Sequence, residues 1–191
     1  MATPPCYPWV VTTDPTDAPV LVRLPAERDL DPLMKLRRNP EVGRWLLHRR
    51  IDPATHRDAV LAPGPDRRRL VAELAGRVVG TGTLEVVDGW TQDDPGAPRR
   101  QEGSIGYLVD PSYAGRGVAT ALATAMLDLA FADLGLRRVT AGCFAANTAS
   151  WKVMEKVGMR REQHGLGDSW HAELGWIDGF TYAVLAEEWC G

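Results

Sequence analysis

The stretch that decides the fold is IGYLVDPSYAGRGVAT, residues 105–120, which has the pattern of a strand, a tight glycine loop and the first turn of a helix. Gly115 and Gly117 lack a Cβ atom, so the backbone of the loop is free to curl around a bound group. The N–H groups of the first helical turn have no acceptor within the helix, and they point to the same place. The stretch therefore predicts a cradle for an anion such as phosphate.

The segments that follow this cradle continue the alternation of helix and strand. Apolar residues at helical spacing predict a helix over 118–134, with Gly135 as its stop. A strand is predicted over 137–144, and a short helix lies within 145–159. The candidate caps and the stop of this short helix are Asn147, Thr148 and Gly158.

Two motifs in this order resemble the GNAT superfamily of acyl-CoA-dependent N-acetyltransferases, and in particular its ribosomal-protein-alanine N-acetyltransferase branch. The first is the pyrophosphate loop of that family, Q/R-x-x-G-x-G/A, which is AGRGVA here, residues 114–119. The second is its asparagine and serine signature, NTASWKVMEKVGM here, residues 147–159. The first loop position, usually Gln or Arg, is Ala114, so a side-chain contact to phosphate is expected to be missing there.

The resemblance implies a layered α+β fold, in which a central twisted, mainly antiparallel sheet carries helices on both faces. One splayed parallel pair of strands would hold acetyl-CoA. Three Asx-Pro pairs predict the starts of helices, at residues 31–32, 39–40 and 52–53. The remaining strands are expected at 20–24, 68–75, 78–87, 104–109, 160–163 and 180–185.

The resemblance also implies how acetyl-CoA would be bound. In the family, a backbone N–H near the end of the cradle strand meets the thioester carbonyl oxygen, which here means Leu108 or Val109. Asn147 would hold the pantetheine amide as well as cap its helix. The other expected cofactor-binding residues are Gly115, Arg116, Gly117, Val118, Ala119, Thr120 and Ser150.

Acyl transfer to an amine needs a proton acceptor for the ammonium and a proton donor for the leaving thiolate. The family places Ser150 beside the sulfur, so it is the candidate donor; the alternative is a helix serine that bonds its own backbone. Glu102 is the first candidate for the base, followed by Glu85. The histidines His48, His56, His164 and His171 lie in no motif, and a site that uses ordered water in place of a base stays open.

Composition restricts the class of protein without selecting the reaction. The chain has 191 residues, of which 45% are hydrophobic, and a net charge of −3, so no nucleic-acid partner is expected. Cys6, Cys143 and Cys190 have no metal-ligand spacing, which predicts reduced thiols in a cytoplasmic protein and no metal. No signal peptide or membrane span is evident. Residues 1–18 are expected to form an N-terminal tail, and 19–191 a single acetyltransferase domain.

The predicted function is transfer of an acetyl group from acetyl-CoA to a primary amine, either a protein N-terminus or a small molecule. The alternative is a GNAT-fold module that binds acyl-CoA without catalysis, as a sensor or scaffold; a nucleotide triphosphate site is disfavoured because the loop lacks a Gly-Lys-Ser/Thr ending. Asp88, Asp93 and Asp94 in the long loop 88–103 are candidates to attract a cationic acceptor. A late aromatic cluster is expected to pack the last strands, with a substrate wall or a homodimer contact as the alternative: Trp170, Trp176, Phe180 and Tyr182.

Overall fold

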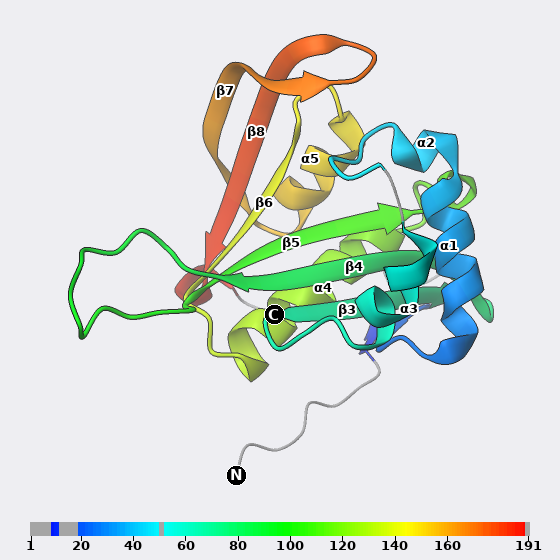
Figure 1. Ribbon diagram of the computed structural model, residues 1–191, viewed down its shortest axis with the longest axis horizontal. Coiled ribbons are helices and arrows are strands. Elements are labelled where there is room, and N and C mark those ends of the chain that lie inside the picture. The colour runs from blue at the N-terminus through cyan, green and yellow to red at the C-terminus, as the bar shows by residue number, and fades with distance from the viewer. Residues whose placement is uncertain (1–8, 12–18, 50–51, 190–191) are drawn as a thin grey trace.

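The computed structural model describes residues 9–11, 19–49 and 52–189, which form one eight-stranded mixed sheet with helices on both faces (Figure 1). The strand order is β1-β2-β3-β4-β5-β6-β8-β7, and only β5 and β6 pair in parallel. The expected fold class is therefore confirmed. The strands are β1 (Trp9–Val11), β2 (Val20–Arg23), β3 (Arg67–Leu74), β4 (Arg77–Val87), β5 (Glu102–Val109), β6 (Arg138–Phe144), β7 (Arg160–His171) and β8 (Gly175–Leu185).

Two of the three predicted helix starts have the expected cap. The side chain of Asn39 accepts from the Glu41 N–H, and that of Asp52 from the Ala54 N–H. The prediction of a cap at Asp31 is wrong, since the helix begins two residues earlier than expected, at Leu30, and has Asp29 at its N-cap. The helices are α1 (Leu30–Arg38), α2 (Pro40–Gly43), α3 (Pro53–Leu61), α4 (Val118–Asp128), with a π-helical turn at Leu129–Asp133, and α5 (Thr148–Lys156).

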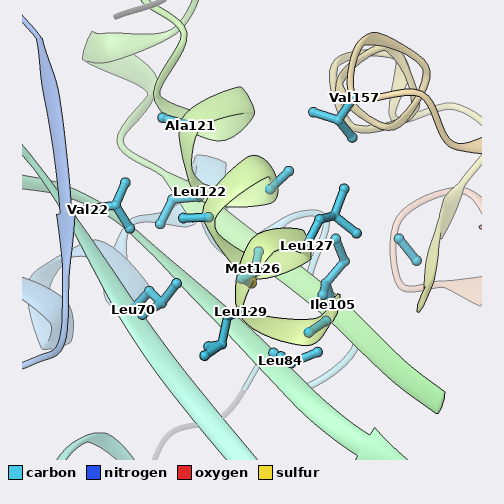
Figure 2. Close-up of a cluster of buried hydrophobic side chains, with 14 of the residues drawn as sticks. Val22, Leu70, Leu84, Ile105, Ala121, Leu122, Met126, Leu127, Leu129 and Val157 are labelled. Atoms are coloured by element: carbon cyan, nitrogen blue, oxygen red, sulfur yellow. The ribbon is translucent and has the colours of Figure 1, made fainter. Parts of the chain in front are cut away.

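The main core lies between α4 and the strands β2 to β5 (Figure 2). Small residues allow the helix to approach the sheet closely: a Cβ on Gly82 would lie 2.9 Å from the side chain of Met126. Leu122 and Met126 are fully buried at this contact. Close packing fixes the start of α4, and therefore the glycine loop before it, relative to β4 and β5.

A smaller core lies on the opposite face of the sheet, where Leu33 of α1 and Val60 of α3 pack against Val71 of β3. Val71 is buried between its neighbours Leu70 and Ala72, which face the main core. Since side chains alternate along a strand, residues at positions 67, 69 and 71 share the face that α1 and α3 cover. This face is the one that carries several arginines.

The last two strands are much longer than predicted, because their hairpin turns at 172–174 instead of ending the first strand at residue 163. The hairpin is irregular, with shifts in pairing near Gly165, and its sequence is too polar to give a clear strand pattern. The predicted packing of the aromatic cluster is wrong for its tryptophans. Trp170 and Trp176 are 60% and 67% exposed, and their rings contact each other with centroids 5.5 Å apart. Tyr182, in contrast, is buried.

Part of the expected tail is ordered in the sheet, because Trp9–Val11 pairs with Val20–Val22 as β1. The rest of residues 1–18, together with Cys6 and Cys190, lies outside the described residues. Within 9–11, 19–49 and 52–189, none of the helices has the length and apolar character that a membrane crossing needs.

Candidate active site

The parallel strands β5 and β6 separate after a short pairing. Glu102, Gly103 and Ser104 pair with residues 138–140. Beyond them β5 pairs only with β4, and β6 only with β8, so the two strands diverge in Figure 1. We call the opening between 105–109 and 141–144 the V. Its closed end is at Glu102, and at its open end β5 leads into the glycine loop.

The V has two sides, because successive side chains of a strand point to opposite faces. Ile105 belongs to the core with α4, so Ile105 and Tyr107 lie on what we call the helix side, which α4 and α5 cover. Ser104, Gly106 and Leu108 lie on the other side, which we call the loop side. Gly106 is exposed, and a Cβ there would have nothing within 4 Å.

Backbone direction distinguishes the two expected N–H donors. The Asp110 N–H donates to the Val79 carbonyl at 2.8 Å, so residue 110 faces β4. The Leu108 carbonyl also faces β4, since it would lie 2.9 Å from a Cβ on Gly80. Backbone groups of successive strand residues point to opposite edges, so Val109 directs its N–H into the V.

The glycine loop at the open end adopts the conformation that its sequence predicts. Gly115 and Gly117 have φ values of +77° and +75°, in the left-handed region that other residues rarely adopt. Gly117 is the N-cap of α4, and no side chain caps this helix. The N–H groups of residues 118–120 therefore fit a phosphate. Arg116 is exposed, with its guanidinium 5.5 Å from the ring of Tyr113.

Ser150 and Asn147 lie together at the start of α5, on the helix side of the V. Asn147 is the N-cap, and its side-chain oxygen accepts from the Ser150 N–H at 3.4 Å. The Tyr107 hydroxyl donates to the Ser150 carbonyl at 2.8 Å and lies 3.4 Å from the Ser150 hydroxyl. Tyr107 of β5 thus holds the first turn of α5 against the V.

Burial changes the acidity of the groups around Ser150. Burial raises the pKa of Tyr107, and the hydrogen bond with Ser150 lowers it by a smaller amount, so that the resulting pKa is about 12. Burial also raises the pKa of Cys143, whose thiol is hydrogen-bonded to the Ser150 side chain. Both groups therefore hold their protons at neutral pH, and the cluster of Tyr107, Cys143 and Ser150 offers hydroxyl and thiol donors without a charge.

The two carboxylates expected as the base do not lie in the V. Glu102 is at the closed end, where its carboxylate binds Arg137 at 2.6 Å and Arg138 at 3.2 Å. Glu85 lies beside Ser104, at the same end, and pairs with Arg67 at 2.8 Å. Both carboxylates are thus engaged by arginines at the closed end, away from the end where β5 leads into the glycine loop. The expectation of a base at either position is therefore not carried forward.

The acidic loop also lies at the closed end, because it joins the ends of β4 and β5 at Val87 and Glu102. β5 runs eight residues from there to the glycine loop, roughly 23 Å at 3.3 Å per residue. The Asp88 and Asp94 side chains accept from backbone N–H groups of their own loop. The expected attraction of a cationic acceptor by this loop does not fit its position.

A segment after α2 crosses the loop side of the V. At one end, the ring of Trp45 packs against the rings of Phe144 of β6 and His171 of β7. The distances between ring centroids are 6.4 Å and 5.2 Å. His171 is buried: its Nε2 lies 2.9 Å from the Arg44 carbonyl, and its Nδ1 accepts from two backbone N–H groups. At the other end, Arg37 of α1 donates to the His48 carbonyl at 2.8 Å.

Three of the four histidines bind other groups of the protein through their ring nitrogens. His171 uses both ring nitrogens, His56 lies 3.0 Å from the Leu30 carbonyl, and His164 pairs with Asp178. His48 is exposed in the crossing segment. In the described part of the chain, no three of its His, Cys, Asp and Glu side chains gather as metal ligands would.

Sequence reasoning missed two features of the site. The first is Tyr107, which packs against the main core and, by alternation along β5 and β6, lies with Cys143 on one side of the V, where Ser150 meets both. The arginines of the loop side, such as Arg37 and Arg69, come from segments that share no motif. Only the pairing of Arg69 with Thr83, and of Thr83 with Gly106, relates them to the V.

Comparison with known proteins agrees with this geometry. The family model described as an acetyltransferase (GNAT) domain matches residues 20–160. YnaD of Bacillus subtilis, an uncharacterized N-acetyltransferase, is 38% identical over 90 residues, which is 44% of this chain and only 49% of that protein. YdaF of the same organism, a putative ribosomal N-acetyltransferase, is 26% identical over 176 residues, 90% of this chain and 94% of YdaF.

A solved structure extends the likeness to three dimensions. RimJ of Mycobacterium smegmatis, in complex with a CoA disulfide, has a TM-score of 0.72 and 26% identity, covering 91% of this chain and 85% of RimJ. The expected resemblance to the family, including its ribosomal branch, is confirmed. With the V, the glycine loop and the family match over 20–160, this chain belongs to the GNAT acetyltransferase family.

Proposed function

We propose that this protein transfers an acetyl group from acetyl-CoA to a primary amine, by direct attack of the amine on the thioester. The observation that carries the proposal is the Ser150 hydroxyl beside the buried Tyr107 hydroxyl, on the helix side of the V. A protein that only stored acyl-CoA would need the cradle, but it would not need a proton donor there.

Main-chain groups would hold the cosubstrate. The N–H groups of residues 118–120 would bind its pyrophosphate, helped by the positive end of the α4 dipole. Asn147 would hold the pantetheine amide. The Val109 N–H would donate to the thioester oxygen, which gains negative charge in the tetrahedral intermediate; donors fixed in this way typically lower the barrier by about 3 kcal/mol.

The amine has to lose its proton before it attacks. The residues that line the V, 105–109 and 141–144, include no Asp, Glu or His. We therefore assign this step to water on the loop side, and the amine's own pKa then sets how much of it is reactive. An α-amino group, with a pKa near 8, is a better acceptor at neutral pH than a lysine side chain near 10.4.

The leaving thiolate needs the proton in its turn. As the new C–N bond forms and the C–S bond breaks, the Ser150 hydroxyl donates to the sulfur. The Tyr107 hydroxyl holds Ser150 in place through its hydrogen bond to the Ser150 carbonyl. Water then returns a proton to Ser150, so that the proton lost by the amine balances the one gained by the thiol.

The experiment is a thiol-release assay with acetyl-CoA against a panel of primary amines, including peptides with free N-termini, together with calorimetry of CoA binding. Binding of CoA with release of thiol that depends on an amine is the expected result. Binding without release for any amine would instead favour the sensor alternative. A cytoplasmic location and a homodimer stay predictions.

A further inference from the structure

A cavity of about 300 Å³ lies beside the loop side of the V, between the C-terminal end of α1 and α2. Three arginines line it, together with Asn39, Pro40 and Gly43: Arg37, Arg38 and Arg49. No carboxylate takes part in its lining. Its position follows from its neighbours, because residue 43 precedes the crossing segment that packs on Phe144 of the V, and Arg37 binds that segment.

Arg37 lacks the partners that a buried guanidinium normally has. Its Nε is buried without a hydrogen-bond partner, and its one hydrogen bond to the protein, through Nη2, is to the neutral His48 carbonyl. Burial lowers the pKa of Arg37, and no carboxylate in the described residues reaches it. A guanidinium drawn partly out of water without a counter-ion is unfavourable, so proteins seldom retain one without a use.

Arg69 of β3 extends this positive region. Its Nε donates only to the Ala59 carbonyl, at 3.1 Å, and no described carboxylate pairs with it. Burial, together with the weaker effect of the neighbouring charges of Arg37 and Arg67, lowers its pKa to about 10. The charge of Arg37 acts on Arg69 in this way because no described carboxylate lies between the two guanidinium groups to compensate it.

The same protein shows what a purely structural arginine looks like. Arg23 binds the buried Asp29 at 2.7 Å and Glu73 at 2.8 Å, and this pairing raises its pKa. Thus the chain supplies carboxylates where an arginine only holds the fold together. Nearby Arg44 and Arg67 also have such partners, in Glu173 and Glu85. Around Arg37, Arg38, Arg49 and Arg69 the described residues supply none, although 25 acidic residues are present in the sequence.

We propose that the acceptor amine itself carries an anionic group, a carboxylate or a phosphate, which binds at the cavity of Arg37, Arg38 and Arg49 while its amino group enters the V. Guanidinium groups bind both kinds of anion through paired N–H donors. This inference rests on the proposed acetyl transfer, and it replaces the cationic acceptor that the acidic loop had suggested.

The test compares matched pairs of acceptors in the thiol-release assay. Phenylalanine and phenylalaninamide differ by a carboxylate, so comparing their rates tests recognition of that group. Phosphoethanolamine and ethanolamine differ by a phosphate and test recognition of phosphate in the same way. We expect the wild-type protein to prefer the anionic member of at least one pair by tenfold or more in kcat/KM, measured at equal concentrations of free base. Which pair shows the preference identifies the anion.

Arg37→Gln should remove this preference and leave the kcat/KM of the neutral member within threefold. Arg49→Gln is the second variant, because Arg49 is exposed and its replacement does not endanger folding. Arg77→Gln is the matched control, since Arg77 is exposed at the start of β4. Equal use of both members of each pair, or a preference that both cavity variants retain, would overturn the inference.

A binding measurement separates this inference from the proposed function. Inorganic phosphate and benzoate, added without acetyl-CoA, should raise the melting temperature of the wild type and of Arg77→Gln more than that of Arg37→Gln or Arg49→Gln. If no amine releases thiol but this difference appears, the transfer reaction falls and the anion site stands. If thiol is released and the difference is absent, the transfer stands and the anion site falls.

Discussion

The two sides of the V are built from different parts of the polypeptide. On the helix side, the cradle is made of backbone N–H groups, two glycines with positive φ and the hydroxyl groups of Ser150 and Tyr107. On the loop side, the cavity is made of long charged side chains that come from α1 and the segment after α2. One side presents fixed dipoles without net charge, and the cavity on the other presents positive charge without a carboxylate partner among the described residues.

This difference indicates what each side is able to discriminate. Backbone donors held by close packing of α4 on the sheet fit one shape of ligand, so they suit a cosubstrate that never changes. Arginine side chains at a cavity adapt to many molecules and select mainly by charge. Substitutions on the helix side should therefore change catalysis and CoA binding for every acceptor, whereas those on the loop side should change the choice of acceptor.

The largest effect is expected from Ser150→Ala. Loss of the proton donor should lower kcat about 100-fold, the lower end of the range for general acid catalysis, and leave the Kd for CoA within twofold. Stopped-flow measurement of thiol release checks this under conditions where chemistry limits the rate. Thr148→Ala is the control, because Thr148 is an exposed residue of the same helix. An unchanged kcat would mean that Ser150 is only a helix residue.

The next effect is expected from Gly117→Val. A β-branched residue does not tolerate a φ of +75°, so the loop should open and the affinity for CoA should fall at least tenfold, about 1.4 kcal/mol. Calorimetry with CoA measures this. Gly64→Val is the matched control, since Gly64 also has a positive φ, +87°, but lies in the loop before β3. Equal CoA affinity in both folded variants would contradict a role of the loop in binding.

The helix side is also the part of the site that the sequence predicted. Its residues lie in two continuous motifs, in which glycine spacing, an N-cap and a serine determine the local geometry without help from the rest of the chain. Fold class, the parallel pair and most element boundaries followed from the same motifs and from the family resemblance. Local rules are sufficient where the backbone itself is the binding group.

The loop side was not predictable in this way. Arg37, Arg49 and Arg69 are separated by α2, α3 and loops, and nothing in their local sequence distinguishes them from exposed arginines. Only the tertiary arrangement shows that they lack carboxylates. The ion pairs of Glu102 were not predictable for the same reason, because the arginines that bind it, Arg137 and Arg138, lie just before and at the start of the parallel strand β6.

A smaller effect is expected from Tyr107→Phe, about fivefold in kcat, because Ser150 remains but loses the hydroxyl that holds it. The raised pKa of Tyr107, about 12, adds a test by pH. Burial disfavours the phenolate, so the hydroxyl stays protonated below that pH, and Tyr107 should cause no fall in kcat between pH 8 and 10. Tyr113→Phe is the control. A fall in wild-type kcat over this range that Tyr107→Phe removes would contradict the assignment.

The smallest effect on activity is expected from Glu102→Gln. Because Glu102 is at the closed end of the V and binds two arginines, the change should leave kcat within twofold and leave the pH profile of kcat/KM unaltered. It should instead lower the free energy of unfolding by about 1 kcal/mol, since both guanidiniums lose a partly buried carboxylate. Urea unfolding and steady-state rates from pH 6 to 9 measure the two effects. If the acidic limb of the pH profile shifted in Glu102→Gln, this carboxylate would have to act on the amine through water, and the helix and loop sides would no longer account for the whole reaction.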